Sequence, residues 1–514
     1  MDMNSGPIKN RLRLTAAVVF LTLTCGGALS ALAQAPAGAQ TLPRTADGKP
    51  NLAGIWQVRD KVSDDLLQTK GIVEGGTIPY IAAAAAKKQA NLKDRKTADP
   101  LEKCFLPGVP RIMYLDYPFQ IFQTPEHVAM TFTWSQVYRL IYTNGKKGLA
   151  GLEFWMGDSR GRWEGDTLVV EVKDFNDQTW FDAAGNYHSD ALTVVERYHL
   201  LNADTIQYEA TITDPKVFSK PWKISMPIQR VKNVPRILEY QCQAEHEEAN
   251  GAFERDPRTW YSPQSPKPTP LASVPTLPDP AAVGTLKRTA DGKPDLTGFY
   301  DQPGNAANYG LERARGVVID PADGMLPYQP WARAERIDRE LPQRGYDDPT
   351  AHCFVAGVPR SHYVPSPIQI LQTPGYVIIL SERMSWRQIF MDGRPHLPDN
   401  VRLWQGDSVG RWEGDTLVVD TTNLNGKTWL NEAGDVISHA EHVVERFIPT
   451  SPDRITYRAT VNDPLVYTRP WTIQVPLNRK ADEILEVACH EDNGDLQHLK
   501  DVKDEFLAKQ KKEK

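Results

Sequence analysis

The chain has 514 residues, 24% of them charged, and a formal net charge of −6. This length exceeds what one ordinary hydrophobic core supports, so two or more domains are expected. The acidic balance disfavours nucleic acid or an anionic membrane surface as the main partner.

The first 33 residues have the pattern of a secretory signal peptide. Lys9, Arg11 and Arg13 precede an apolar run, and Ala31-Leu32-Ala33 offers a cleavage site of small residues. Cleavage there removes three basic residues and one acidic residue and takes the net charge from −6 to −8. A retained membrane anchor is the alternative, but no later stretch is apolar enough to span a bilayer. We therefore expect a periplasmic or secreted protein with no stable membrane span after cleavage.

Two long repeats show that the chain is internally duplicated. The decapeptide Gly-Arg-Trp-Glu-Gly-Asp-Thr-Leu-Val-Val occurs at Gly161–Val170 and again at Gly410–Val419, 249 residues later. Arg-Thr-Ala-Asp-Gly-Lys-Pro likewise occurs at Arg44–Pro50 and Arg288–Pro294. Such self-similarity indicates two copies of one module. The decapeptide itself predicts a β-hairpin, in which Glu-Gly-Asp makes the turn and β-branched residues begin the second strand.

Both copies show the same order of elements. A helix is expected over Ile81–Lys93 and over Trp331–Leu341, before a loop rich in Pro and Gly. Short strands with polar and apolar residues in alternation follow. Asn144-Gly145 and Asp392-Gly393 predict hairpin turns between two of them. Each copy is expected to end on a strand that carries its second cysteine.

We therefore predict a mainly β protein of two homologous antiparallel β-barrels, each with a short helical insertion. A closed barrel removes the exposed edges of such a meander. Two β-sandwiches are the alternative. The expected divisions are a signal peptide, a first β module, an extended Pro-rich connector that buries little, a second β module and a charged tail, at residues 1–33, 34–257, 258–285, 286–500 and 501–514.

Four cysteines remain after signal cleavage, an even number that suggests disulfides in an exported protein. They are Cys104, Cys242, Cys353 and Cys489. Because each copy has one cysteine early and one late, we expect the pairs Cys104–Cys242 and Cys353–Cys489. Crossed bonds between the copies are the less simple alternative.

Two resemblances accompany these patterns. Gly54-Ile55-Trp56 resembles the Gly-x-Trp opening of lipocalin-like (calycin) barrels. The decapeptide, Thr179-Trp180, His188–Tyr198 and their counterparts in the second copy resemble a family of exported, uncharacterised bacterial proteins. This second resemblance covers nearly all of the mature chain. It implies export and the β-rich module, and it implies no particular activity.

Several carboxylates are shared by the two copies. Those beside the turn glycine of the decapeptide are expected to hold the turn by hydrogen bonds. Glu196 and Glu445 each precede an arginine on a strand, so one member of each pair should point inward and need a cross-strand partner. Glu171 and Asp420 either face solvent or act as acid–base carboxylates inside the barrel.

Histidines distinguish the copies, with four in the first and seven in the second. Arg394-Pro395-His396 also stands where the first copy has Lys146-Lys147-Gly148. Because histidine exchanges protons near neutral pH, the working site is expected in the second copy. The catalytic candidates are His396, His442, Asp407 and Arg360. A metal site from His362, His396 and His442 with Asp407 is an open alternative without tight ligand spacing, and no cofactor is predicted.

Three classes of function remain open. No P-loop or dinucleotide fingerprint is present, which argues against a standard NTPase or nicotinamide enzyme. Small barrels hold one modest ligand in their mouths, so the first hypothesis is binding of a small hydrophobic or aromatic molecule. The second is a cofactor-independent lyase, isomerase or hydrolase that uses His and Asp/Glu of the second copy. The third is a purely structural envelope protein.

Overall fold

The computed structural model describes residues 42–149, 151–251, 256–265, 277–303, 306–491 and 493–513. The expected signal peptide and the middle of the connector, 266–276, lie outside these residues. Both copies of the module are therefore described nearly in full.

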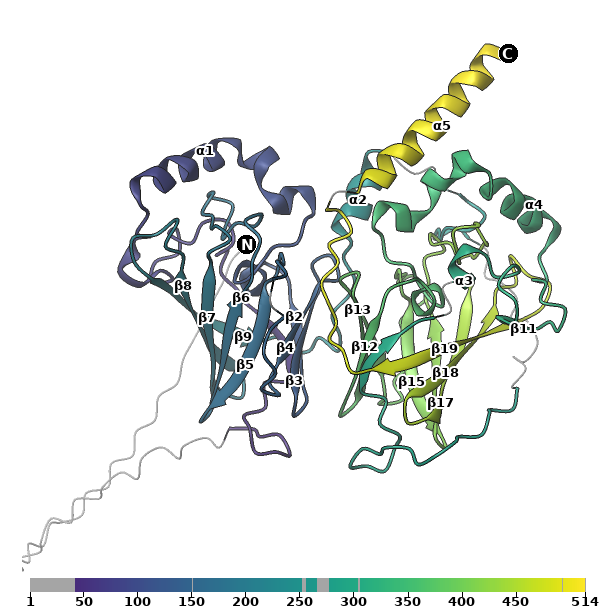
Figure 1. Ribbon diagram of the computed structural model, residues 1–514, viewed down its shortest axis with the longest axis horizontal. Coiled ribbons are helices and arrows are strands. Elements are labelled where there is room, and N and C mark those ends of the chain that lie inside the picture. The colour runs from purple at the N-terminus through teal and green to yellow at the C-terminus, as the bar shows by residue number, and fades with distance from the viewer. Residues whose placement is uncertain are drawn as a thin grey trace, which may run out of the picture. The chain divides into compact units, whose positions relative to one another are not determined.

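In the first copy nine strands close into a barrel. The strands β2 to β9 are labelled in Figure 1. The first strand pairs with the second on one side and with the ninth on the other, which leaves no open edge among the described strands of this copy. The strands are β1 (Gly54–Gln57), β2 (Phe119–Gln123), β3 (His127–Phe132), β4 (Tyr138–Tyr142), β5 (Asp158–Glu164), β6 (Thr167–Lys173), β7 (Thr193–Asn202), β8 (Thr205–Thr213) and β9 (Trp222–Arg230).

The second copy repeats this arrangement. Nine of its strands form a ring closed by pairing of β10 with β19, and a short extra strand, β11, pairs with β19. The strands are β10 (Gly298–Asp301), β11 (Val318–Asp320), β12 (Ile368–Thr373), β13 (Tyr376–Ser381), β14 (Ser385–Phe390), β15 (Asp407–Glu413), β16 (Thr416–Thr422), β17 (His442–Ser451), β18 (Arg454–Asn462) and β19 (Trp471–Lys480). The predicted pair of barrels is confirmed, and the sandwich alternative is wrong.

Every second side chain along a strand points into the barrel, and these inward side chains fill the barrel interiors. In β7 the side chains of Val194, Glu196, Tyr198 and Leu200 are buried, whereas the residues between them are partly or fully exposed. This period of two is the spacing at which side chains on a strand share one face. Apolar side chains of the inward sets make up most of the core, and β8 (Thr205–Thr213) shows the alternation that its sequence predicted.

One strand pair in each barrel is parallel, which differs from the expected hairpins at Asn144-Gly145 and Asp392-Gly393. β4 pairs with β5 in parallel through Tyr142 and Arg160, and β14 pairs with β15 in parallel through Ile389 and Ser408. A two-residue hairpin joins only antiparallel strands, whereas parallel strands need a long crossover. The connections that contain these Gly residues are therefore crossovers, and the hairpin expectation is wrong.

The repeated decapeptide forms the β5–β6 hairpin in one barrel and the β15–β16 hairpin in the other. Glu164 is opposite Thr167 across the turn, and Gly165 has φ +59°, a left-handed conformation that favours glycine. Arg44 donates two hydrogen bonds to the turn residue Asp166, at 2.9 and 2.8 Å. Arg288 and Asp415 repeat this contact in the second copy. In each copy, the Arg-Thr-Ala-Asp-Gly-Lys-Pro segment is therefore hydrogen-bonded to the turn of the decapeptide hairpin.

Within the described parts of the chain, five α-helices accompany the barrels. α1 (Ala82–Ala98) and α4 (Pro330–Arg339) are the two expected insertions, and each lies at one end of its own barrel (Figure 1). The others are α2 (Cys242–Ala249), α3 (Ala306–Tyr309) and α5 (Gly494–Glu513). The expected charged tail thus belongs to α5. No helix among the described residues combines the length and apolar character needed to cross a membrane.

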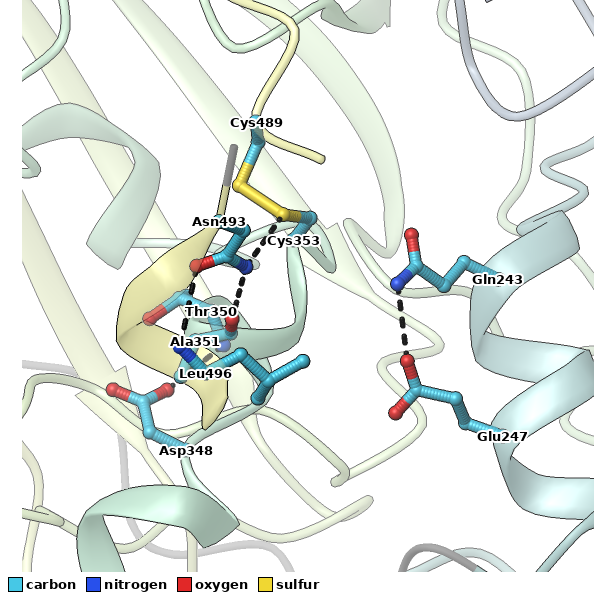
Figure 2. The surroundings of a disulfide bond; sticks show 9 residues. All are labelled: Gln243, Glu247, Asp348, Thr350, Ala351, Cys353, Cys489, Asn493 and Leu496. Carbon is cyan, nitrogen blue, oxygen red and sulfur yellow. Dashed lines mark hydrogen bonds between the residues drawn. A yellow bond between two sulfur atoms is a disulfide. The ribbon is translucent and has the colours of Figure 1, made fainter. Parts of the chain in front are cut away.

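Both expected disulfides are present, Cys104–Cys242 and Cys353–Cys489. The second cysteine of each copy does not lie in a strand, contrary to expectation. Cys242 begins α2, and Cys489 lies in a turn ahead of α5. Figure 2 shows Asn493 beside the second bond, where its amide donates to the carbonyl oxygen of Ala351 at 3.0 Å. Each disulfide therefore ties the segment after the last barrel strand to the loop ahead of the second strand of its barrel.

The described parts of the connector pack against the second barrel, although an extended segment that buries little was expected. Thr259 is 1% exposed, and its carbonyl oxygen accepts a hydrogen bond from the backbone N–H of His439 at 2.8 Å. Asp279 accepts hydrogen bonds from Arg446 at 2.9 and 2.6 Å. Proline prevents regular structure here, but it does not prevent the flanking residues from making such local contacts.

A buried ion pair lies inside each barrel. Arg139 binds Glu196 in the first, and Arg387 binds Glu445 in the second, with both glutamates fully buried. Tyrosine hydroxyls complete each network: that of Tyr208 donates to Glu196 at 2.7 Å, and that of Tyr457 donates to Glu445 at 2.8 Å. The expectation that these glutamates need an inward cross-strand partner is confirmed.

Candidate functional site

Four polar side chains from the strand ends and the β14–β15 crossover of the second barrel lie in one cluster. Asp407 begins β15, Asp420 lies near the end of β16, and His442 begins β17. These strands are antiparallel neighbours, so the start of one lies beside the end of the next. His396 reaches the same place from the β14–β15 crossover. Strand order alone therefore assembles residues that are up to 46 positions apart in the sequence.

The cluster is a continuous chain of hydrogen bonds. His396 contacts Asp407 through Nδ1 at 3.2 Å and Asp420 through Nε2 at 3.0 Å. His442 contacts the same Oδ1 of Asp420 through its own Nε2, also at 3.0 Å. Arg236, from the segment that follows the last strand of the first barrel, binds the other oxygen of Asp407. Two carboxylates thus alternate with an arginine and two imidazoles.

Neighbouring opposite charges fix the protonation states of His396 and Asp420, which lie at the centre of this series of hydrogen bonds. Hydrogen bonds from both ring nitrogens, to Asp407 first and then to Asp420, raise the pKa of His396 to about 9. Burial alone would raise the pKa of Asp420, but its contacts with His396 and His442 hold that pKa well below its usual value. His396 is therefore an imidazolium at neutral pH, and Asp420 is a carboxylate.

Replacing His396 should destabilise the protein only at low and neutral pH. The folded pKa of about 9 lies above the unfolded value near 6.5, so the stabilisation is complete below about pH 6.5 and lost as pH rises through about 9. Since the imidazole is 29% exposed, we expect His396→Gln to lower the free energy of unfolding by only about 1–2 kcal/mol at pH 6. Urea unfolding at pH 6, 8 and 10 measures it. If the difference in free energy of unfolding between His396→Gln and the native protein stays constant up to pH 10, the raised pKa of His396 is contradicted.

The contact with Asp420 also fixes the tautomer of His442. A carboxylate only accepts hydrogen bonds, so Nε2 of His442 must carry the proton that it shares with Asp420. A neutral His442 then has its lone pair on Nδ1. This is the arrangement in which a carboxylate orients a histidine as a general base.

His396 and His442 lie in the wall of a cavity of about 520 Å³. Its other polar lining residues include Arg402, Asn423 and His439, and apolar walls come from Tyr261, Pro263, Leu397 and Pro464. The volume falls in the range of small-molecule pockets, about 300–1,000 Å³. A mostly apolar lining with a few convergent polar groups is also typical of such pockets.

Three lining residues have buried polar atoms without a hydrogen-bond partner in the described structure. They are Glu441, through both carboxyl oxygens, Arg402, through Nε, and Asn462, through Oδ1. Glu441 is 2% exposed, and burial, followed by the nearby Asp463 and Glu445, raises its pKa well above the usual value. Buried polar atoms normally have partners, so several orphans around one cavity point to water or a bound molecule.

Sequence analysis missed these three residues, although the duplication contains the signal for two of them. Glu441 occupies the position of Leu192 in the first copy, and Asn462 occupies that of Thr213. Leu192 is a buried core residue, 2% exposed. The second copy thus has an unpaired carboxyl where the first copy has a core leucine. A buried unpaired carboxyl lowers stability, so its presence points to a functional role.

The structure brings three of the four catalytic candidates together and places the fourth elsewhere. Arg360 is 1% exposed and binds Asp348 through two hydrogen bonds of 2.9 and 2.8 Å. Arg111 and Asp99 form the same pair in the first copy. Arg360 is not among the residues that line the cavity. Its contacts are those of a buried ion pair that both copies of the fold contain.

The alternative metal site is not assembled as a whole, because His362 lies apart from the cluster that contains His396, His442 and Asp407. His362 lies inside the second barrel, 3.2 Å from Arg387, and burial lowers its pKa to about 3. Among the described residues, the group with metal-ligand spacing is Cys104, Cys242 and His246, and both of its sulfurs belong to the disulfide. Hydrogen bonds and opposite charges therefore account for the cluster beside the cavity.

No protein-family model and no curated protein matches the chain. Among solved structures, a protein of unknown function from the DUF3598 family of Nostoc punctiforme PCC 73102 aligns with 74% of this chain and 98% of its own. The two are 9% identical, with a TM-score of 0.14. A likeness of that size assigns neither fold nor function, so a function for this chain has to come from its own residues.

Proposed function

We propose that the second barrel binds a small molecule with an apolar body and at least one hydrogen-bonding group, in the cavity beside His396 and His442. The observation that carries this proposal is the buried, unpaired carboxyl of Glu441 in the cavity wall. A bound molecule that hydrogen-bonds to it would remove the cost of leaving it unpaired.

Export belongs to the same proposal. The N-terminal pattern of a signal peptide and two disulfides are both typical of a periplasmic or secreted protein. The resemblance of the repeated module to exported bacterial proteins supports the same location.

Acid–base catalysis on the bound molecule is a second candidate function. His442, oriented by Asp420, offers a basic nitrogen, and Glu441 offers a carboxyl whose pKa burial raises well above its usual value. A basic imidazole nitrogen and a carboxyl of raised pKa in the wall of one cavity are typical of an acid–base pair. This pairing favours proton transfer, as in a lyase or isomerase, and hydrolysis remains an alternative.

Replacing Glu441 by leucine, the residue of the first copy, tests the binding proposal. The change removes a buried unpaired carboxyl at nearly constant volume, so we expect a gain of about 1–3 kcal/mol in the free energy of unfolding. The same change should reduce occupancy by any co-purified small molecule at least tenfold. Urea unfolding measures the first effect and native mass spectrometry the second. Increased stability with loss of binding is typical of a functional residue.

The reciprocal variant Leu192→Glu is the matched control in the first barrel. It should lose stability, because it creates a buried carboxyl where the first copy has an apolar core residue, and it should leave occupancy unchanged. Unchanged occupancy in Glu441→Leu, or a loss of stability there as large as in Leu192→Glu, would show that Glu441 serves the fold and would refute the proposal.

A further inference from the structure

The two disulfides occupy equivalent positions in the two copies, but their surroundings differ. His246 and Asn493 each stand four residues after the second cysteine of their own bond. Nδ1 of His246 lies 3.7 Å from Sγ of Cys104. In the second copy, Nδ2 of Asn493 donates to Sγ of Cys353 at 3.4 Å, as Figure 2 shows. The same position therefore meets a sulfur atom in both copies, with an imidazole in the first and an amide in the second.

An imidazole and an amide differ in what they can do for a sulfur that becomes a thiolate. Nδ1 of an imidazole can donate a hydrogen bond to the thiolate, and it can also transfer its proton. An amide N–H only donates a hydrogen bond, and Asn493 also donates to the carbonyl oxygen of Ala351 at 3.0 Å. Since a neighbouring histidine is a known means of stabilising a thiolate, the first bond should be the easier of the two to reduce.

The secondary structure around the second cysteine of each bond differs in the same direction. Cys242 is the first residue of α2, and Gln241 before it makes no capping hydrogen bond through its side chain. The first N–H groups of a helix have no partner within the helix, and they stabilise a thiolate beside them. Cys489 lies in a turn outside α5. Two features that stabilise thiolates are therefore found at the first bond and not at the second.

Exposure alone favours the opposite order of reactivity. Cys104 is 8% exposed and Cys242 is 2% exposed, whereas Cys353 and Cys489 are both partly exposed. Exposure changes how fast a reductant reaches a disulfide, but the equilibrium depends only on the free energies of the oxidised and reduced forms. The ring of His246 is exposed, so the sulfur that it contacts lies close to solvent.

We propose that Cys104–Cys242 is an exchange-active disulfide that oxidises small thiols, whereas Cys353–Cys489 only holds the fold. A small thiol is the class of substrate that suits a sulfur of this limited exposure, because a folded protein would need more surface around the bond. The reaction consumes two thiols and yields one disulfide, and the protein gains two electrons and two protons.

The exchange has two steps. The thiolate of the first substrate attacks Sγ of Cys104, the more exposed sulfur, so that a mixed disulfide forms and the Cys104–Cys242 bond breaks. Cys242 leaves with the electron pair as a thiolate at the start of α2. A second substrate thiolate attacks the substrate sulfur of the mixed disulfide, and Cys104 leaves as a thiolate beside His246. This thiolate takes the proton from Nδ1 of His246, which regains one from solvent.

The test is equilibration of the full mature chain with mixtures of reduced and oxidised dithiothreitol, with a chelator present to keep metal ions from the free thiols. Alkylation after acid quenching, followed by peptide mass spectrometry, gives the reduced fraction of each bond in the same molecules. We expect the equilibrium constant for reduction of Cys104–Cys242 to be at least tenfold larger than that of Cys353–Cys489, a difference of about 30 mV. Equal constants, or a first bond that stays oxidised in fully reduced dithiothreitol, would overturn the proposal.

Reciprocal variants separate the imidazole from other differences between the copies. His246→Asn places the amide of the second copy beside Cys104 and should lower the constant of the first bond at least fivefold, with the second bond unchanged. Asn493→His should raise the constant of the second bond. His199→Asn, at an exposed position on β7, is the control and should change neither. Thermal midpoints of the oxidised proteins check that each variant folds.

An unchanged first bond in His246→Asn would show that the imidazole has no part in the exchange and would refute the assignment. None of these measurements depends on a ligand in the cavity beside His442, because neither disulfide belongs to the wall of that cavity.

Discussion

Glu445→Leu is expected to lower the free energy of unfolding by about 3–5 kcal/mol, since it leaves the Arg387 guanidinium buried without its carboxylate. Glu445 is fully buried in the second barrel and binds Arg387 through both oxygens. It also accepts hydrogen bonds from Tyr457 at 2.8 Å and Thr421 at 3.0 Å. Those donors lose a partner in the variant, which places the cost at the upper end for a single substitution.

Urea unfolding measures this loss. With a slope of about 1–3 kcal/mol per molar urea, a loss of this size moves the midpoint by at least about 1 M. Glu196→Leu is the matched change in the first barrel and should cost a similar amount, because Arg139 and Tyr208 bind Glu196 as Arg387 and Tyr457 bind Glu445, and Tyr198 supplies a further hydroxyl donor.

The double variant Arg387→Leu with Glu445→Leu separates the pair from its surroundings. Replacing a whole buried ion pair by apolar residues is often neutral or stabilising, so the double variant should recover most of the loss. If the double variant is as unstable as Glu445→Leu alone, the cost lies in packing and not in an uncompensated charge, and our explanation is incorrect.

Local and repeated features of the fold could be predicted from the sequence. The alternation along β8, the hairpin at Gly161–Val170 and the two helical insertions depend on neighbouring residues, so their patterns are visible in the chain. The pairing of the cysteines followed from the duplication alone. These features needed no knowledge of which distant strands lie side by side.

Features set by distant contacts could not be predicted. Asn144-Gly145 is a hairpin signal by local chemistry, but the strands around it pair in parallel because the crossover between them is long. Arg236 reaches Asp407 across 171 residues, and nothing in its own stretch marks it as part of the cluster. Arg360 is a catalytic candidate in the sequence, whereas its partner Asp348, which explains it, lies only 12 residues away.

His442 shows both what the sequence could predict and what required the strand pairing. Its presence in one copy only, where the other has Thr193, made it a candidate. Its contact with Asp420 became evident only when β16 and β17 were seen to pair. Comparison of the two copies therefore finds residues that are free to serve a site, and the strand order shows which of them act together.

Replacing His442 by glutamine is expected to reduce turnover about 100- to 10,000-fold, the usual contribution of a general base. This expectation depends on the second candidate function, acid–base chemistry in the cavity. His442 is 35% exposed on the side chain and begins a strand, so the change should alter the free energy of unfolding by less than about 1 kcal/mol. The assay substrate is the molecule that co-purifies with the native protein.

Asp420→Asn should reduce turnover nearly as much, and it has a readout that needs no substrate. A neutral amide can donate as well as accept, so it no longer holds the proton of His442 on Nε2. Nitrogen-15 shifts of the imidazole should report one tautomer, protonated at Nε2, in the native protein and a mixture in the variant. Thr193→Ala is the control at the equivalent position of the first barrel and should change neither turnover nor tautomer. If His442→Gln keeps its activity while Thr193→Ala loses it, the working site is in the first barrel and the assignment is wrong.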